Sequence, residues 1–165
     1  MTLVPYRADA AVQYAHRWAF DRNPRYYDYS DLGGDCTNFA SQCLFAGAGV
    51  MDYTPTFGWY YINPNEKAPA WTGVPYLYNY LVRARATPGP LALEVGPDAV
   101  KPGDLVQLTF DGVRWAHSSV IVAVGSSPAP DNILVAAHSE DSDNRPLSTY
   151  EYVRARFLHM YGVRR

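Results

Sequence analysis

The sequence predicts an α+β fold in which N-terminal helices pack on a C-terminal antiparallel sheet. Apolar residues in the first half recur with the 3.6-residue period of helices, whereas those after residue 90 alternate as in strands. The turn-forming residues Thr87-Pro88-Gly89-Pro90 mark the change of period. Helices followed by a run of strands are typical of α+β proteins. The chain has 165 residues, and we expect residues 1–165 to form one domain.

Two helices are predicted before residue 50. Residues 7–20 carry small apolar side chains on one face, and Asn23-Pro24 ends that helix. The second helix begins after Asp35, which we expect to be its N-cap, and it ends at Gly47 and Gly49. Its apolar residues recur at i, i+3, i+4, i+7 and i+8, namely Cys36, Phe39, Ala40, Cys43 and Leu44.

A segment rich in proline and aromatic residues, 50–71, precedes a third helix predicted at about residues 75–85. Loops of this length in compact domains are usually functional or disordered, and the aromatic residues favour a functional loop. The chain has 14 Tyr and 4 Trp, residues that combine an apolar ring with a polar atom, as a binding groove requires. We therefore expect Trp59 and Trp71 to line a substrate groove.

The second half of the chain is predicted to be mostly strand. Lys101-Pro102-Gly103 and Asp111-Gly112 supply turns between the strands. The predicted strands lie near residues 104–110, 115–124, 132–139 and 155–163, with a further short strand near 91–95.

Charge and composition exclude several kinds of partner. The net charge is −2 and no basic stripe is present, so we expect no nucleic-acid partner. No apolar run approaches the roughly 18 to 20 residues of a membrane span, so we expect no membrane partner. The N-terminus lacks a basic leader and an apolar signal core, which favours a cytoplasmic protein or one exported by another route. We expect a monomer with no cofactor and no metal.

The two cysteines are expected to differ in role. On one helix, Cys36 and Cys43 would lie about 10 Å apart along the axis, too far for a disulfide, and their spacing is not that of a zinc knuckle. Cys43 lies two turns into the helix, where a small core residue is expected. Cys36 follows Gly33-Gly34-Asp35 at the first turn, where unpaired N–H groups and the helix dipole favour a thiolate. We interpret Cys36 as a nucleophile, although the charge of Asp35 opposes the thiolate.

Among the four histidines, His117 is the best candidate for the base. It opens an almost wholly apolar strand directly after a turn, so its side chain can reach the edge of a cleft while the strand stays rigid. A histidine of the core would more often lie in the middle of such a strand.

The residue that orients this base is predicted from strand pairing. If Val122 faces Ile133 in an antiparallel pair, then His117 faces His138. A slip of two residues would bring Glu140 opposite His117 instead, and Asp141 points to the other face unless a bulge intervenes. We therefore favour His138, with Glu140 and then Asp141 as the alternatives.

Residues 33–44, GGDCTNFASQCL, resemble the signature of the bacterial amidase-domain family, which is similar to NlpC-type and CHAP-type cell-wall hydrolases. Further matches occur in the same order as in the family: KPGDLV at 101–106, HSSVIV at 117–122, and Ala137-His138-Ser139 with Asp141. The resemblance implies a papain-like fold with Cys36, His117 and a third polar residue, most simply His138. It also implies two oxyanion donors, the backbone N–H at Cys36 and a tyrosine hydroxyl, for which Tyr27 or Tyr29 is the candidate. Asp35, Trp59 and Trp71 complete the set expected near the substrate.

These features predict a cysteine amidase or peptidase that acts through an acyl-thioester intermediate. The expected substrate is a peptide or small amide, with peptidoglycan stem peptides as the leading example. One alternative is intracellular acyl transfer or biosynthetic amide processing at the same Cys-His-His site. Another alternative is a binding module without turnover, which would have no need of both Cys36 and His117.

Overall fold

The computed structural model describes residues 1–165 and contains four α-helices and nine β-strands. The helices are α1 (Ala8–Trp18), α2 (Cys36–Ala48), α3 (Pro69–Thr72) and α4 (Val74–Val82). The strands are β1 (Leu3–Val4), β2 (Tyr61–Asn63), β3 (Glu66–Lys67), β4 (Gly89–Val95), β5 (Leu105–Thr109), β6 (Trp115–Val124), β7 (Ile133–Ala137), β8 (Ser142–Pro146) and β9 (Arg154–Arg164). Two short 3₁₀ helices, η1 (Pro97–Ala99) and η2 (Leu147–Thr149), lie between strands.

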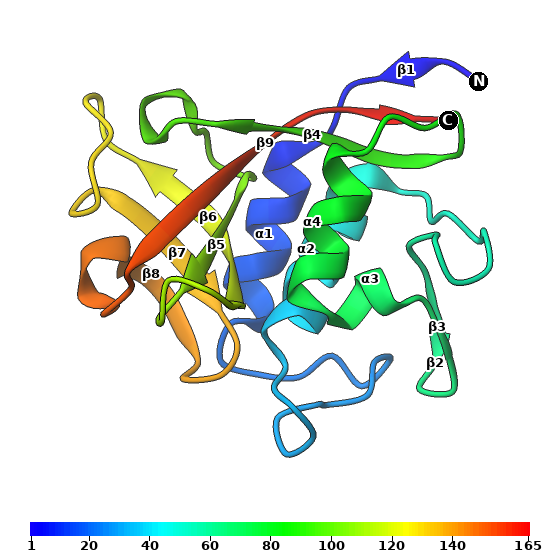
Figure 1. Cartoon of the computed structure of the whole chain (residues 1–165), viewed down its shortest axis with the longest axis horizontal. Coiled ribbons are helices and arrows are strands. Elements are labelled where there is room, and N and C mark those ends of the chain that lie inside the picture. Colours follow the sequence, from blue (N-terminus) through cyan, green and yellow to red (C-terminus); the bar gives the residue numbers. More distant parts are fainter.

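One antiparallel sheet of seven strands organises the molecule. Its order is β1-β9-β5-β6-β7-β8, and β4 also pairs with β9 (Figure 1). A separate hairpin, β2–β3, belongs to the segment before α3. The two termini lie side by side because β1 pairs with the end of β9, with Leu3 opposite Arg164. The predicted α+β class is confirmed.

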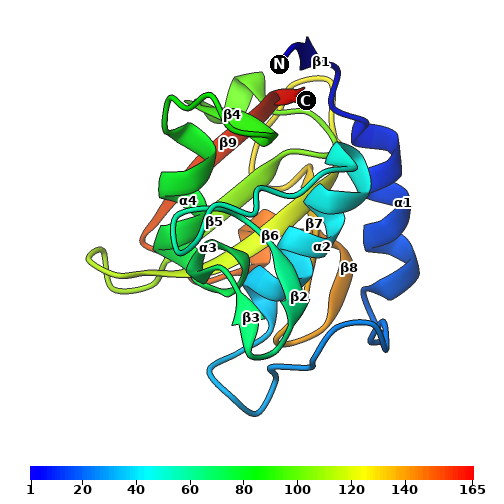
Figure 2. The same cartoon turned by 90° about the vertical axis from the view of Figure 1, so that its right-hand side faces the viewer.

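The two faces of the sheet are covered differently. Helices α1, α2 and α4 cover one face, and Figure 2 shows α2 between α1 and α4, against β6. This face forms the larger core, to which the sheet contributes Leu105, Val120, Ala136, Leu158 and Met160. The opposite face carries a smaller apolar cluster that includes Leu147 of η2. None of the helices combines the length and the apolar character needed to cross a membrane.

Helix α2 is the central helix, and its predicted apolar stripe is confirmed. Phe39, Ala40, Cys43 and Leu44 are fully buried, whereas Cys36 at the first position is partly exposed. The helix ends as predicted at Gly49, whose left-handed backbone (φ 73°) lets its N–H bond the Phe45 carbonyl.

Asp35 occupies the N-cap position of α2, but its side chain caps no backbone N–H of the helix. Its carboxylate accepts hydrogen bonds from the Tyr29 N–H and the Asn38 side-chain amide, and it contacts the His138 ring. The prediction that Asp35 is the N-cap is confirmed for its position, but its carboxylate bonds these groups in place of a backbone N–H of the helix.

Several other elements differ from the predicted ones. Helix α1 ends at Trp18, two residues early, and α4 ends at Val82. The 50–71 segment contains the β2–β3 hairpin and most of α3. Strand β8 was not predicted, because the sequence Ser142–Pro146 has no apolar alternation and follows a tight turn.

The pairing of β6 with β7 corrects the predicted register. Val124 faces Ile133, and a bulge between Ile121 and Ala123 shifts the pairing so that Val120 faces Ala136. Continued toward the start of β6, this register places Ser139 opposite His117 and His138 opposite Ser118. A shift of one residue exchanges the faces of the sheet. The two histidines therefore lie on opposite faces.

Replacing Cys43 by alanine tests the packing of α2. Cys43 is a free thiol that is fully buried in the larger core, so Cys43→Ala should lower the free energy of unfolding by about 1 kcal/mol or more. Urea unfolding followed by circular dichroism measures the change. A variant as stable as the unmodified protein would show that the thiol contributes no packing.

Candidate active site

The first turn of α2 places Cys36 beside β6, a central strand of the sheet. The chain reaches it through Gly33 and Gly34, whose backbones are left-handed (φ 86° and 100°), a conformation that glycine adopts without strain. Cys36 Sγ lies 3.7 Å from the Thr37 hydroxyl, and that hydroxyl lies 3.0 Å from the Ser118 hydroxyl of β6. The thiol therefore lies where α2 meets the start of β6, one residue from His117. The prediction that both cysteines are free thiols is confirmed.

The surroundings of Cys36 do not favour a resting thiolate. Burial raises the pKa of the Cys36 thiol, and the neighbouring Asp35 charge raises it further. Hydrogen bonds from the Ser118 backbone and from Thr37 offset only part of this increase in pKa. The sequence prediction of a lowered thiol pKa was wrong, because burial is the largest influence on this thiol and disfavours its charged form. The thiol needs a base in order to react at neutral pH.

Asp35, the residue before Cys36, forms a buried pair with His138. His138 Nδ1 is 2.5 Å from Asp35 Oδ2, and each side chain is 1% exposed. The imidazole stacks on the Phe39 ring with centroids 4.0 Å apart. Its Nε2 lies 2.8 Å from the Trp18 carbonyl oxygen and 3.2 Å from Arg22 Nη1. His138 therefore connects the end of α1, the first turn of α2 and the end of β7.

His117 lies on the opposite face of the sheet, near η2. Its Nε2 is 2.8 Å from the Ser119 hydroxyl, and its ring lies 5.4 Å from that of Tyr150, centroid to centroid. Burial lowers the pKa of His117 from 6.5 to about 4, and the Arg145 charge adds to this effect. The ring is therefore neutral at pH 7.

The predicted hydrogen bond between the rings of His117 and His138 is not present. His117 bonds Ser119, whereas His138 bonds Asp35 and the Trp18 carbonyl. The bulge in β6 is the reason, because it turns the two side chains to different faces. No hydrogen bond joins either ring to Cys36 Sγ. The one side-chain hydrogen bond of Cys36 Sγ is with the Thr37 hydroxyl.

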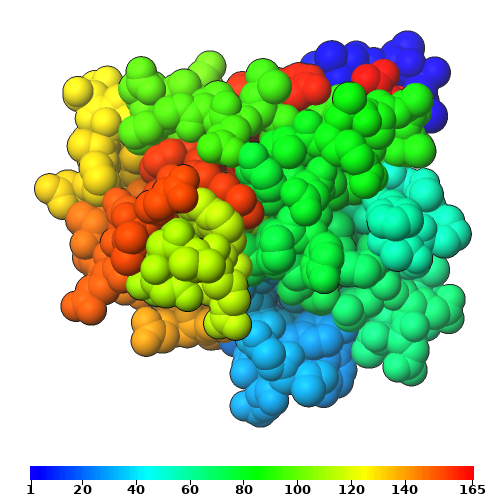
Figure 3. Space-filling model, viewed as in Figure 1, coloured from blue at the N-terminus to red at the C-terminus, as the bar shows by residue number.

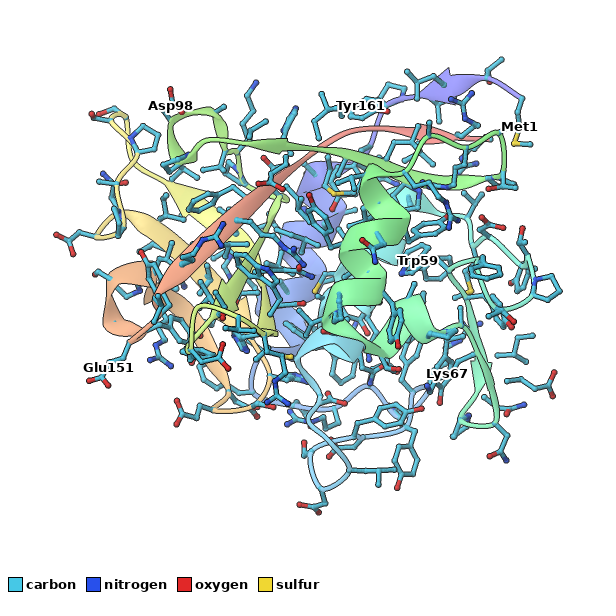
Figure 4. The ribbon with its side chains drawn as sticks, in the orientation of Figure 1. Met1, Trp59, Lys67, Asp98, Glu151 and Tyr161 are labelled. Atoms are coloured by element: carbon cyan, nitrogen blue, oxygen red, sulfur yellow. The ribbon has the colours of Figure 1, made fainter.

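A cavity of about 490 Å³ opens beside His117. Ser139 links this cavity to the first turn of α2, because its hydroxyl accepts a hydrogen bond from the Asp35 N–H at 3.4 Å. The cavity is lined by Phe110, His117, Ser139, Glu140, Arg145, Thr149, Tyr150 and Glu151. In Figure 3 the yellow-green tip near residue 110 lies against the orange segment near residue 150, and Figure 4 shows Glu151 at the outer edge. The Tyr150 hydroxyl is buried without a partner.

Glu140 and Asp141, the alternative partners of His117, make no hydrogen bond with it. Glu140 lines the same cavity, with its side chain 84% exposed. Asp141 pairs with Arg22, with Nη1–Oδ2 at 2.9 Å and Nη2–Oδ1 at 3.0 Å. The turn that carries them is unusual, since Ser139 and Glu140 both have left-handed backbones (φ 64° and 57°) without being glycine.

Trp59 and Trp71 do not line a groove. Both are fully buried, with ring centroids 4.8 Å apart, and Figure 4 shows Trp59 beside α4. Their indole N–H groups donate to side chains of α2, Trp59 to the Ser41 hydroxyl and Trp71 to the Asn38 side-chain oxygen Oδ1. The predicted groove was wrong, because polar side chains of a buried helix satisfy both indoles.

The two candidate tyrosines differ in environment. Tyr27 is 46% exposed, and its backbone N–H donates to the Tyr61 hydroxyl. Tyr29 is buried, its hydroxyl has no partner, and burial raises its pKa to about 12. A buried hydroxyl without a partner is rare, and a substrate atom that accepts its hydrogen bond would satisfy it. Tyr29 is therefore the stronger candidate.

Four residues of this region were not singled out from the sequence: Arg22, Ser118, Ser119 and Ser139. The paired serines interrupt an otherwise apolar strand, a signal that could have identified them. Nothing in the local sequence marks Arg22 or Ser139, since their contacts cross more than 100 residues.

The lowered pKa of His117 predicts a pH-dependent stability. The unfolded chain binds a proton near pH 6.5 and the folded chain only near pH 4, so stability falls as the pH decreases across that interval. The free energy of unfolding should decrease by about 2–3 kcal/mol. Urea unfolding between pH 7 and pH 4 measures it, and His117→Gln, which cannot titrate, is the control. An equal pH dependence in the two proteins would contradict the assignment.

Comparison with known proteins identifies the family. Residues 5–161 match the family model described as "Putative amidase domain". The uncharacterized proteins YhbB and YjcM of Bacillus subtilis (strain 168) are 35% identical over 139 residues and 30% identical over 158 residues. These alignments cover 82% and 92% of this chain but only 42% and 34% of the two relatives. No solved structure is significantly similar to this chain. The chain belongs to the putative amidase domain family.

Proposed function

We propose that this chain hydrolyses an amide bond with Cys36 as the nucleophile. The position of Cys36 carries the proposal: it is a partly exposed free thiol at the first residue of a buried helix, beside the strand that bears His117. Membership of the amidase family supports this chemistry. The other cysteine, Cys43, is fully buried.

The reaction would proceed in two steps. Cys36 Sγ attacks the carbonyl carbon as its proton passes to an imidazole, and the imidazole returns that proton to the leaving amine as the C–N bond breaks. Water then attacks the thioester, which releases the carboxylic acid and restores the thiol. Each step needs one imidazole that is neutral and free to accept a proton.

His117 is the better candidate for this base. It is neutral at pH 7 and lines an open cavity, whereas both nitrogens of His138 already face an oxygen atom. The proposal requires the His117 ring to leave the Ser119 hydroxyl and approach Cys36, since no hydrogen bond joins them. His138 would then act as a positioning residue that holds Asp35 and the first turn of α2.

The developing oxyanion would be stabilised by the unpaired N–H groups of the first turn of α2. Tyr29 is the second donor in this proposal, because its buried hydroxyl has no partner and its N–H tethers it to Asp35. A helix that carries a nucleophilic cysteine in an open first turn and packs on an antiparallel sheet is the arrangement expected of a papain-like fold. We therefore propose that the fold is papain-like and related to NlpC-type and CHAP-type enzymes.

The substrate class follows from the reaction and from the family resemblance. We propose a peptide or amino-acid amide, with peptidoglycan stem peptides as the first substrate to test. Acyl transfer to an amine, in place of water, is the second candidate. Cys36 is only partly exposed, and a site that limits the access of water lets a bound amine compete for the thioester.

Replacing the nucleophile should abolish turnover. Cys36→Ala should reduce amide hydrolysis at least about a thousandfold, since the covalent step is lost. Product release from purified peptidoglycan and from a library of small amides, followed by chromatography, measures the rate. Cys43→Ala is the matched control and should keep its activity. Hydrolysis that survives in Cys36→Ala would exclude the proposed mechanism.

Replacing His117 should slow amide hydrolysis more than replacing His138. His117→Ala should reduce the rate about a hundredfold or more by removing the base, whereas His138→Gln, which can still donate to Asp35, should cost about tenfold or less. Steady-state rates on the best amide substrate measure both. A larger loss in His138→Gln than in His117→Ala, in folded proteins, would reverse the two roles.

A further inference from the structure

Arg22 follows α1 and connects this part of the chain with three others near Cys36: the loop before α2, Asp35 and the β7–β8 turn. Its guanidinium forms a two-pronged ion pair with Asp141 in the β7–β8 turn. Nη2 donates to the Ser30 hydroxyl at 3.1 Å, and Nε lies 3.2 Å from Asp28 Oδ1. These contacts tie the loop before α2 to the turn after β7. The side chain is 27% exposed, so the guanidinium is partly removed from water.

The same guanidinium also faces Asp35. Arg22 Nε lies 3.8 Å from Asp35 Oδ2, the oxygen that His138 contacts. Asp35 is buried and precedes Cys36, so its negative charge opposes the formation of a thiolate. A cation at this distance attracts the carboxylate and opposes the effect of its negative charge on neighbouring groups.

The Arg22–Asp141 pair also holds a strained turn. Ser139 and Glu140 have left-handed backbones that cost free energy for residues other than glycine. The Ser139 hydroxyl accepts a hydrogen bond from the Asp35 N–H, so the conformation of the turn is coupled to the start of α2. Arg22 thus has two separable effects, one on the charge beside Cys36 and one on the geometry of the turn.

We infer that Arg22 is a positioning residue of the Cys36 site, which offsets the Asp35 charge and thereby makes the Cys36 thiolate accessible to the base. The inference rests on the proposed function. Arg22 acts through Asp35 and makes no contact with Cys36 itself. Apart from Asp35, the charged or titratable groups on the elements packed around the first turn of α2 include Arg22, Asp28, Tyr29, His117, His138, Glu140 and Asp141.

The pH dependence of Cys36 alkylation tests this role without a known substrate. Iodoacetamide labelling, mapped by peptide mass spectrometry, gives the pH midpoint of thiolate formation. Arg22→Ala should raise this midpoint by about half a unit to one unit, because the Asp35 charge is left less compensated. Arg22→Lys should restore part of the shift, since an ammonium keeps the charge but loses the planar fork.

Two further variants separate charge from geometry. Asp141→Asn breaks the pair that holds the turn but leaves the Arg22 charge near Asp35, so the midpoint should stay unchanged or fall. Arg17→Ala is the matched control: Arg17 stacks on Trp18, with its guanidinium carbon 4.9 Å from the ring centroid, and should leave the midpoint unchanged. Thermal unfolding of each variant confirms that the protein is folded during labelling.

The possible outcomes distinguish this inference from the proposed function. If Cys36 of the unmodified protein is not labelled in preference to Cys43, the nucleophile assignment fails. If Cys36 is labelled but Arg22→Ala leaves its midpoint unchanged, the role of Arg22 fails alone. If Asp141→Asn raises the midpoint as much as Arg22→Ala does, Arg22 is a structural clamp and the charge effect is refuted.

Discussion

The buried contact between Asp35 and His138 is the interaction on which the candidate site depends. It joins the first turn of α2 to the end of β7, and His138 also reaches the end of α1 through the Trp18 carbonyl. The remaining oxygen of Asp35 binds the Tyr29 backbone and the Asn38 side chain. A buried carboxylate is costly unless it is paired and fully hydrogen-bonded, and this one is both. The position of Cys36 follows from this contact, because Cys36 is the next residue along the chain.

This arrangement also has an electrostatic cost at Cys36. The carboxylate that fixes the helix stands next to the thiol, and burial and this charge both raise the thiol pKa. His138 and Arg22 both face the carboxylate. The thiol is therefore poised to react only when a base takes its proton.

Much of the fold could be predicted from local patterns. The face of the sheet on which each site residue lies could not. The apolar spacing of Cys36, Phe39, Ala40 and Cys43 predicted α2, and the apolar run of β6 predicted its bounds. The bulge in β6 leaves no trace in that run, yet it separates His117 from His138. Trp59 and Trp71 were placed in a groove because their partners on α2 are apparent only in three dimensions. Sequence patterns report which residues repeat, but long-range hydrogen bonds decide where polar side chains point.

The central claim is that Cys36 forms a covalent acyl intermediate. The most direct measurement is intact-protein and peptide mass spectrometry after rapid acid quenching of the protein with an amide substrate that it turns over. The account predicts an added mass equal to the acyl group, located on the peptide that contains Cys36 and removed by hydroxylamine, which cleaves thioesters. Turnover with an adduct on another residue, or turnover by Cys36→Ala, would contradict it.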